Sequence, residues 1–299
     1  MKNIPAKERL IFAMDVPTCD RAKELATELG DAVTFYKIGL ELMMSGEYFD
    51  LLDWMLARDK KVFCDLKFFD IPATVGSAVR SLRNRGATFV TVHGNRSIME
   101  AAAENKGDSL KVLGVTVLTS LDRGDLDDLG FDCDIGELVL SRARRALESG
   151  CDGVISSGLE VPKLREFIDE KLVVVTPGIR PVDNKPAGDQ KRVVTVDTAF
   201  ANGADYIVVG RPIRDADSPR AAAEASWSVP ARVARGGANG DNEERKFHGQ
   251  DHQVQDPQRE AVNSNNSQHR EEDAWRRREE RGGTAPPRRR FRVPRPSEQ

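Results

Sequence analysis

Short apolar runs alternate with longer amphipathic stretches along the first 225 residues of the chain. The runs are almost continuously apolar, as in strands that are buried on both faces of a parallel sheet. They predict strands at 10–14, 33–38, 61–66, 88–93, 110–118, 153–156, 172–176 and 205–209. The amphipathic stretches between them predict helices at 19–29, 46–57, 74–85, 97–105, 135–149, 160–168 and 198–202.

Several of these helices end at a glycine that leads into the next strand: Gly30, Gly86, Gly107, Gly150 and Gly203. Glycine accepts the left-handed backbone that closes a helix, so these positions mark helix ends. Eight β/α units in this length predict an α/β protein, a closed (β/α)8 TIM barrel. A doubly wound open sheet is the alternative, but no Gly-x-Gly-x-x-Gly follows the first predicted strand.

The composition changes near residue 225. From Ser226 to Gln299 the sequence is rich in Arg, Glu, Gln, Asn, Gly and Pro and poor in aliphatic residues. Such a segment has too little apolar surface to offset the conformational entropy that ordering would cost. We therefore expect a barrel domain at 1–225 and a disordered polar tail at 226–299. We also expect the tail to shorten the last barrel helix and so lower stability.

Charge and residue usage exclude several classes of protein. Outside the tail the net charge is about −6, which argues against nucleic-acid binding. Three of the four histidines lie in the tail, so His93 alone offers neither a histidine-rich metal site nor a Ser-His-Asp triad. The widely spaced Cys19, Cys64, Cys133 and Cys151 predict free thiols in a reducing cytoplasm. The charged N-terminus does not read as a signal peptide, and no run is long enough to cross a membrane.

Polar residues gather where the predicted strands end. These residues are Asp15, Lys37, Asp65, Lys67, His93, Thr119, Ser120, Arg180 and Arg211. In a (β/α)8 barrel the C-terminal ends of the strands carry the active site. A single polar residue there is explained by capping, but seven of eight strand ends in this pattern indicate a binding or catalytic site.

The densest cluster of charges lies in the block from Asp65 to Thr74. Because alternate side chains of a strand share a face, we expect Asp65 and Lys67 to point the same way, with Asp70 at the turn before Pro72. Charges that are paired and buried together shift pKa values and suit chemistry built from fixed charges, without metal or cofactor. A surface ion pair at a strand end is the alternative.

The loops after the seventh and eighth strands predict a phosphate site, as in many barrels of this class. Gly178 and Gly210 let backbone N–H groups approach an anion, and the guanidinium groups of Arg180 and Arg211 suit phosphate. Gln190 adds an amide donor. It lies in the polar loop 181–191, which we expect to close over the phosphate.

Taken together, these motifs resemble the orotidine 5′-phosphate decarboxylase family. In the family's order they are Phe35-Tyr36-Lys37-Ile38-Gly39, the block from Asp65 to Thr74, Val117-Leu118-Thr119-Ser120, Thr176-Pro177-Gly178-Ile179-Arg180-Pro181, Asp189-Gln190 and Val208-Val209-Gly210-Arg211-Pro212-Ile213. The resemblance covers residues 9–224. Its most specific parts are Asp-x-Lys-x-x-Asp-Ile-Pro-x-Thr and Thr-Pro-Gly-Ile-Arg-Pro, since sugar-phosphate relatives share only Asp-x-Lys-x-x-Asp.

The resemblance implies that the chain decarboxylates orotidine 5′-phosphate to uridine 5′-phosphate in pyrimidine biosynthesis, with no metal or cofactor. Lys67 would protonate C6 of the pyrimidine, with Asp65, Asp70 and Lys37 completing the catalytic charge array. In the homodimer that the family forms, Asp70, Ile71 and Thr74 would reach the neighbouring subunit's site.

The resemblance also implies a set of substrate-binding residues. Asp15 and Lys37 would hold ribose hydroxyl groups, and Thr119 and Ser120 would lie at the base. The remaining implied contacts to the substrate come from Ile71, Thr74, Pro177, Arg180, Gln190, Gly210 and Arg211. We expect Arg180, Gln190, Gly210 and Arg211 to hold the 5′-phosphate.

Two other functions remain open from the residues alone. One is a metal-dependent sugar-phosphate lyase or epimerase that uses Asp65 and Asp70 on the same barrel. The other is a disabled homologue whose arginine-rich tail binds a partner. We expect no membrane or nucleic-acid partner.

Overall fold

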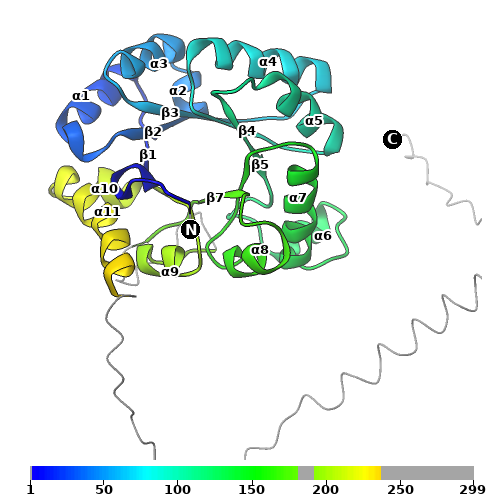
Figure 1. The fold of residues 1–299 in the computed structure, drawn as a ribbon. Coiled ribbons are helices and arrows are strands. Elements are labelled where there is room, and N and C mark those ends of the chain that lie inside the picture. The colour runs from blue at the N-terminus through cyan, green and yellow to red at the C-terminus, as the bar shows by residue number, and fades with distance from the viewer. Residues whose placement is uncertain (1, 181–191, 237–299) are drawn as a thin grey trace, which may run out of the picture. The chain divides into compact units, whose positions relative to one another are not determined.

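In the computed structural model, which describes residues 2–180 and 192–236, eight parallel strands form a closed barrel (Figure 1). Each strand pairs with its neighbour in sequence, and β1 closes the barrel against β8. The strands are β1 (Leu10–Ala13), β2 (Phe35–Gly39), β3 (Lys61–Phe68), β4 (Phe89–Val92), β5 (Lys111–Val115), β6 (Gly153–Ile155), β7 (Val173–Thr176) and β8 (Tyr206–Val209). The prediction of a (β/α)8 barrel is therefore confirmed.

Helices surround this barrel. They are α1 (Cys19–Leu29), α2 (Leu40–Met43), α3 (Tyr48–Leu56), α4 (Pro72–Arg85), α5 (Arg96–Asn105), α6 (Arg123–Asp128), α7 (Ile135–Glu148), α8 (Val161–Phe167), α9 (Val196–Ala201), α10 (Arg211–Arg214) and α11 (Pro219–Gly236). Two 3-10 turns, η1 (Ala6–Arg9) and η2 (Gly30–Ala32), complete the described elements.

The predicted elements match the structure closely, with three omissions. All five glycines expected to end helices have positive φ, between 54° and 97°. The pattern missed α2, α6 and α10, which have only four to six residues and are too short to show a helical period. The predicted strand 110–118 was too long, because β5 ends at Val115 and an irregular segment follows.

The barrel interior is filled by aromatic side chains at the N-terminal ends of the strands. The ring of Phe89 lies 5.0 Å from that of Phe35, 5.9 Å from Phe63 and 5.2 Å from Tyr206, between centroids. These side chains are at most 8% exposed. They close the barrel from below, so that any cavity can open only at the opposite end.

The last helix differs from the prediction. We expected it to stop near residue 225, but α11 runs from Pro219 to Gly236. Trp227 packs against the barrel's outer core, and the Nζ atom of Lys7 lies 6.0 Å from the centre of its ring. The helix therefore covers the outer wall that a shortened helix would have exposed. Residues 237–299 lie outside the described part, so a disordered tail stays a prediction.

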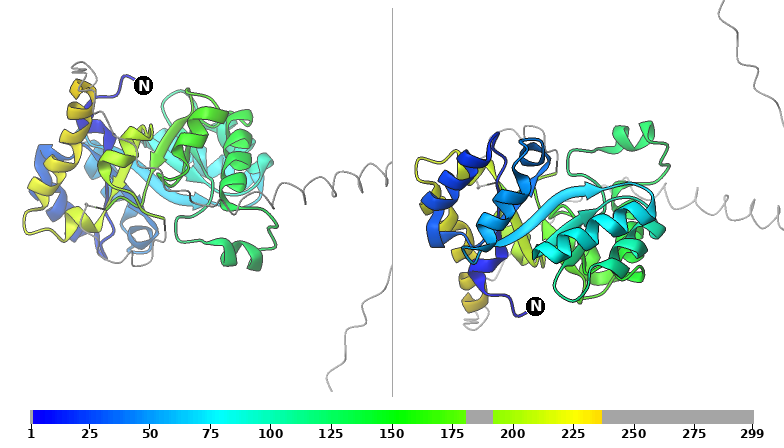
Figure 2. Two further views of the ribbon diagram at one scale, coloured as in Figure 1. Left: turned by 90° about the horizontal axis from the view of Figure 1, so that it is seen from below. Right: turned by 90° about the horizontal axis from the view of Figure 1, so that it is seen from above.

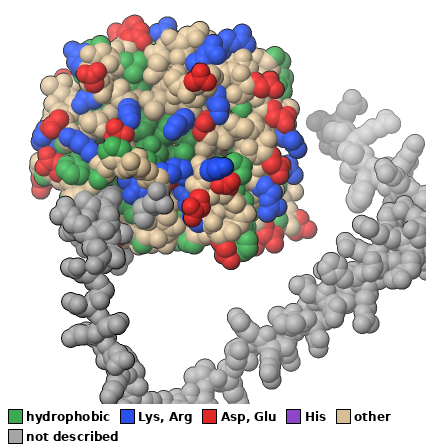
Figure 3. All heavy atoms as spheres, viewed as in Figure 1, with side chains coloured by type: hydrophobic (Ala, Val, Ile, Leu, Met, Phe, Trp, Pro, Cys, Tyr) green, Lys and Arg blue, Asp and Glu red, His purple; other side chains and the backbone are tan. Residues whose placement is uncertain are grey.

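Two further views place the segment with α6 at the end of the barrel opposite the N-terminus (Figure 2). On the face where the N-terminus lies, basic and acidic side chains are interspersed rather than separated by sign (Figure 3). Such a mixed surface offers no extended positive field to a nucleic acid.

Within residues 2–180 and 192–236, none of the helices combines the length and hydropathy of a transmembrane span.

Candidate active site

A pocket of about 630 Å³ opens at the C-terminal ends of the strands. Seven of the eight strands contribute lining residues, from their last positions or from the loops that follow. The predicted site residues that line it are Asp15, Lys37, Asp65, Lys67, Thr119, Ser120, Pro177, Arg180, Gly210 and Arg211. The fold thus gathers in one cavity residues that lie up to 196 positions apart in the sequence.

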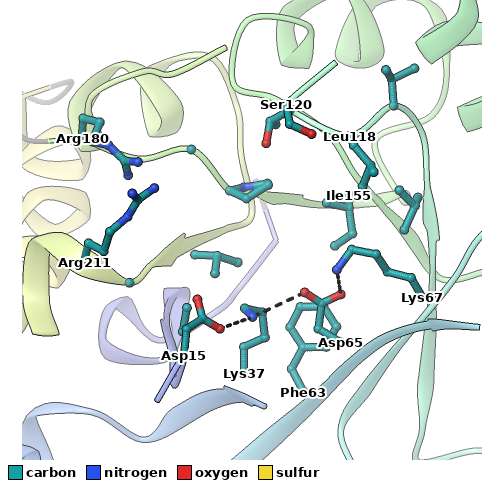
Figure 4. A pocket seen from close by; sticks show the side chains of 18 of the residues that line it. Asp15, Lys37, Phe63, Asp65, Lys67, Leu118, Ser120, Ile155, Arg180 and Arg211 are labelled. Carbon is teal, nitrogen blue, oxygen red and sulfur yellow. Dashed lines mark hydrogen bonds and ion pairs between the residues drawn. The ribbon is translucent and has the colours of Figure 1, made fainter. Parts of the chain in front are cut away.

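Four charged side chains form a chain of ion pairs across the pocket floor (Figure 4). The Lys67 Nζ atom lies 3.0 Å from Oδ1 of Asp65, and the Lys37 Nζ atom lies 3.5 Å from Oδ2 of the same carboxylate. Lys37 also lies 3.0 Å from Oδ1 of Asp15. Asp65 and Lys37 are only 13% and 12% exposed, whereas Lys67 is 35% exposed. Lys67 is therefore held by a buried carboxylate and still reaches the cavity.

The backbone of β3 is irregular where these residues lie. The pairing of β3 with β4 shifts between Cys64 and Phe68, and Lys67 has a φ of 48°. A positive φ is uncommon for a residue with a side chain, and such strain persists only where surrounding contacts impose it. Thr91 supplies these contacts, because its Oγ1 atom accepts from the Lys67 backbone N–H at 2.9 Å and donates to Asp65 Oδ1 at 2.9 Å. Asp65 and Lys67 do line the same pocket, but across a bulge rather than a regular strand.

The ion pairs set the protonation of the two buried groups. Burial pushes the pKa of Asp65 upward, but Lys37, Lys67 and the hydrogen bond from Thr91 outweigh it and hold the pKa below its ordinary value. Burial lowers the pKa of Lys37, but the carboxylates of Asp65 and Asp15 outweigh it and raise the pKa above its ordinary value. At neutral pH the floor of the pocket therefore carries fixed charges of both signs.

At another side of the pocket, the side chains of Arg180 and Arg211 point toward one another (Figure 4). Arg180 follows β7, and Arg211 opens α10 after β8, where Gly210 is the N-terminal flanking residue. A Cβ atom at Gly210 would lie 3.3 Å from that of Ala13, so the glycine keeps this wall open. Two guanidinium groups facing a shared space attract an anion. Gln190 and the loop 181–191 lie outside the described residues.

Apolar and hydroxyl-bearing residues form the side of the pocket above the ion pairs. Val117, Leu118, Thr119 and Ser120 come from the irregular segment after β5, and Ile155 ends β6. Figure 4 shows Leu118 and Ser120 across the cavity from Asp15 and Asp65. The cavity therefore has one apolar and hydroxyl-bearing side and one charged side.

Three predicted site residues do not line this pocket. Asp70, Ile71 and Thr74 are exposed at the start of α4, and Ile71 is 66% exposed. Asp70 accepts a hydrogen bond from the Ile71 backbone N–H at 2.6 Å. Asp70 therefore does not line the pocket that Asp65 lines. Across the described chain, no three His, Cys, Asp or Glu residues are grouped to hold a metal ion.

Arg214 and Thr91 belong to the site but were missed from the sequence. Arg214 lines the pocket and donates to the backbone oxygen of Asp15 at 2.7 Å. Its position three residues after Arg211 would place both arginines on one helix face, but the sequence pattern did not predict α10. Thr91 carried no signal, since a threonine inside a strand is ordinary and its role depends on the bulge in β3.

Comparisons with known proteins show the family to which the sequence and the fold are similar. Residues 8–226 match the family described as Orotidine 5′-phosphate decarboxylase / HUMPS family. An orotidine 5′-phosphate decarboxylase of Methylococcus capsulatus is 70% identical over 223 residues, which are 75% of this chain and 92% of that protein. One of Xylella fastidiosa is 49% identical over 220 residues, 73% of this chain and 90% of the relative. The crystal structure of an orotidine 5′-phosphate decarboxylase from Lactobacillus acidophilus aligns with a TM-score of 0.66 at 36% identity, covering 74% of this chain and 98% of that one.

The lowered pKa of Asp65 predicts how stability depends on pH. Its ionised form contributes stability above the unfolded pKa of about 3.9, and this contribution is lost as the pH falls through the lower folded pKa. We expect the free energy of unfolding to fall more steeply below about pH 4 in the wild type than in Asp65→Asn. Urea denaturation at pH 7, 4 and 3 measures this slope.

Asp108→Asn is the matched control, because Asp108 is exposed. Its stability should follow the wild-type pH dependence. Equal acid sensitivity of the wild type and Asp65→Asn would contradict the assignment of the buried charge.

Proposed function

The chain belongs to the orotidine 5′-phosphate decarboxylase / HUMPS family, and we propose that Lys67 carries the chemistry of its site. The reaction is the decarboxylation of orotidine 5′-phosphate to uridine 5′-phosphate and CO2 in pyrimidine biosynthesis. An enzyme that catalyses it is a carbon–carbon lyase. One observation carries the proposal for Lys67. Its Nζ atom is held 3.0 Å from a buried carboxylate inside the cavity that Arg180 and Arg211 also line.

Loss of CO2 from C6 of the pyrimidine leaves an electron pair in the plane of the ring. The ring's π system cannot delocalise that pair, so stabilisation has to come from charge that is already oriented. The Lys67 ammonium group supplies such a charge, since Asp65 holds it in place. It first attracts the developing carbanion at C6 and then transfers a proton to it. The proton ends on C6, and the amine is left neutral until solvent reprotonates it.

Asp65 has a second effect in this proposal. A substrate carboxylate bound beside the Asp65 carboxylate is repelled, and the repulsion falls as neutral CO2 forms. Lys37 limits the cost of burying Asp65, because it lies 3.5 Å from the other carboxylate oxygen. The pair of Lys37 and Asp15 lies between the reacting end and the arginines, where it can hold ribose hydroxyl groups.

The 5′-phosphate fits between Arg180 and Arg211, with Gly210 beside it. These groups are remote from the reacting carbon. The energy with which they bind the phosphate can stabilise the closed site, and this increases the rate of the reaction. Gln190, implied as a fourth phosphate contact, lies outside the described residues and stays a prediction.

The metal-dependent alternative fits this geometry poorly. Asp65 already accepts from Lys67 and Thr91 and pairs with Lys37, so a divalent cation there would face two ammonium groups. Asp70 is not beside it. A disabled barrel is equally unsupported, because α11 completes the outer wall.

A homodimer is the assembly we propose. Four exposed large apolar residues lie in the segments that follow β2 and β3, namely Leu40, Met44, Phe69 and Ile71. Apolar patches rimmed by polar residues mark interaction sites. A second copy on this surface would receive Asp70, Ile71 and Thr74 into its own site.

The four cysteines are unpaired, which supports the cytoplasm as the compartment of this protein.

Replacement of Lys67 tests the proposed chemistry. Lys67→Ala should lower kcat by at least about 10³-fold, because proton donation and charge stabilisation are both removed. Binding of uridine 5′-phosphate should persist. Ultraviolet absorbance follows orotidine 5′-phosphate consumption, and calorimetry follows binding. The control is Lys163→Ala, at an exposed lysine of α8, which should keep wild-type turnover. Turnover by Lys67→Ala at the wild-type rate would rule out the proposal.

Replacement of Arg211 tests the phosphate site. Arg211→Ala should lower kcat/KM by about 10²-fold, the scale of a lost hydrogen bond between charged groups. Orotidine, which lacks the phosphate, should be turned over equally by wild type and variant. The exposed Arg144 on α7 provides the control variant Arg144→Ala. An equal loss for both substrates would contradict phosphate recognition by Arg211.

Mixing two inactive variants tests the shared site. Lys67→Ala and Asp70→Asn should each be inactive alone. A mixed dimer rebuilds one intact site of two, so an equimolar refolded mixture should recover about a quarter of wild-type activity. Sedimentation measures the dimer in the same samples. If the mixture forms mixed dimers and recovers no activity, Asp70 serves the site of its own subunit, whereas wild-type activity of Asp70→Asn alone would show that Asp70 serves no site.

A further inference from the structure

Arg192 is a buried arginine to which the proposed reaction assigns no role. Its side chain is 10% exposed, and NH1 lies 2.5 Å from Oε1 of Glu160, itself 11% exposed. Burying such a pair costs desolvation energy, so it is weak evidence for a purely stabilising role. The contacts of the second guanidinium nitrogen of Arg192 are therefore informative.

The second guanidinium nitrogen of Arg192 holds the segment that forms the upper side of the pocket. NH2 donates to the backbone oxygen of Val117 at 3.1 Å and to that of Leu118 at 3.0 Å. The Arg192 backbone N–H donates to the oxygen of Thr119 at 3.3 Å. Three successive carbonyl groups of the pocket wall thus accept from one residue.

This segment has no regular secondary structure to fix it. β5 ends at Val115 and α6 begins at Arg123, so Val117 to Ser120 lie between elements. A loop whose carbonyl groups lack a ladder depends on side chains or water for its hydrogen bonds. The planar, forked guanidinium group reaches the carboxylate and the carbonyl groups with separate nitrogens, which a single ammonium nitrogen cannot do.

The backbone next to Arg192 also holds the arginine end of the pocket. The Val194 N–H donates to the Gly178 oxygen at 3.1 Å, and the Arg180 N–H donates to the Val194 oxygen at 3.0 Å. Ile179 and Val194 form an isolated parallel bridge. A stretch of three residues therefore contacts the segment with Thr119 on one side and the segment with Arg180 on the other.

We propose that Arg192 is a positioning residue that sets the spacing between the Thr119–Ser120 wall and Arg180, and so selects ligands that span both. The inference rests on the proposed function, in which the base lies at that wall and the phosphate at Arg180. Arg192 touches neither group of the substrate. Its effect should appear only for ligands that carry a base as well as a phosphate.

Two ligands and two variants test this positioning role. Uridine 5′-phosphate spans both ends, and ribose 5-phosphate reaches the phosphate end alone. Arg192→Lys keeps the charge beside Glu160 but loses the forked guanidinium group. Its affinity for uridine 5′-phosphate, divided by its affinity for ribose 5-phosphate, should fall about tenfold. Glu160→Gln removes the same ion pair and keeps the donors to Val117 and Leu118, so its affinity ratio should stay within about twofold of wild type. Calorimetry gives both affinities, and circular dichroism confirms folding.

Each outcome decides between positioning and stability. A wild-type affinity ratio in Arg192→Lys, or an equal shift of the ratio in Glu160→Gln, overturns the inference. If Arg192→Lys does not fold, the double variant Arg192→Gln with Glu160→Gln removes both charges together. Its ratio of the two affinities is then compared with that of the wild type. Wild-type turnover of orotidine 5′-phosphate is measured separately. Its absence refutes the proposed function, whereas turnover with an unchanged ratio refutes only the role of Arg192.

Discussion

The structure of the site depends on one buried carboxylate that lies between two ammonium groups. Asp65 is 13% exposed and accepts from Lys67 while it pairs with Lys37. Each charge alone would be too costly to bury, and each is stabilised by its opposite. The ion pairs raise the pKa of Lys37 and hold both lysines in place, so the charges need little reorganisation during the reaction. A preoriented positive charge is what a carbanion in a ring plane requires.

The barrel makes this arrangement possible because it brings distant charges to one rim. Lys37, Asp65 and Thr91 come from three consecutive strands, and the β3 bulge turns Lys67 into the cavity. The aromatic layer around Phe89 closes the opposite end. Water and ligand therefore reach the charges from one side only, where Arg180 and Arg211 can bind an anion. Arg192 bonds to Val117 and Leu118 on one side of the cavity, and the neighbouring Val194 bonds to Gly178 and Arg180 on the other.

Much of the fold and part of the site were predictable from local signals. Apolar runs located all eight strands, and terminal glycines located helix ends, because burial and backbone freedom are properties of single segments. The sequence predicted Asp65, Lys67 and the two arginines as site residues, because a barrel places the ends of its strands together. Short helices such as α10, and with it Arg214, were missed because four residues show no period. The extent of α11 was missed because Trp227 gains its stabilisation by packing against the barrel rather than from neighbours in sequence.

The sequence by itself determined the order of strands and helices, the chemical groups at each strand end and the family resemblance. Only the tertiary structure decided which of those groups meet. It paired Asp65 with two lysines, placed Thr91 beside them, left Asp70 outside the pocket and gave Arg192 its carbonyl partners. The reason is physical: residue type and spacing are local, whereas desolvation and hydrogen bonding depend on distances that exist only once the barrel has closed.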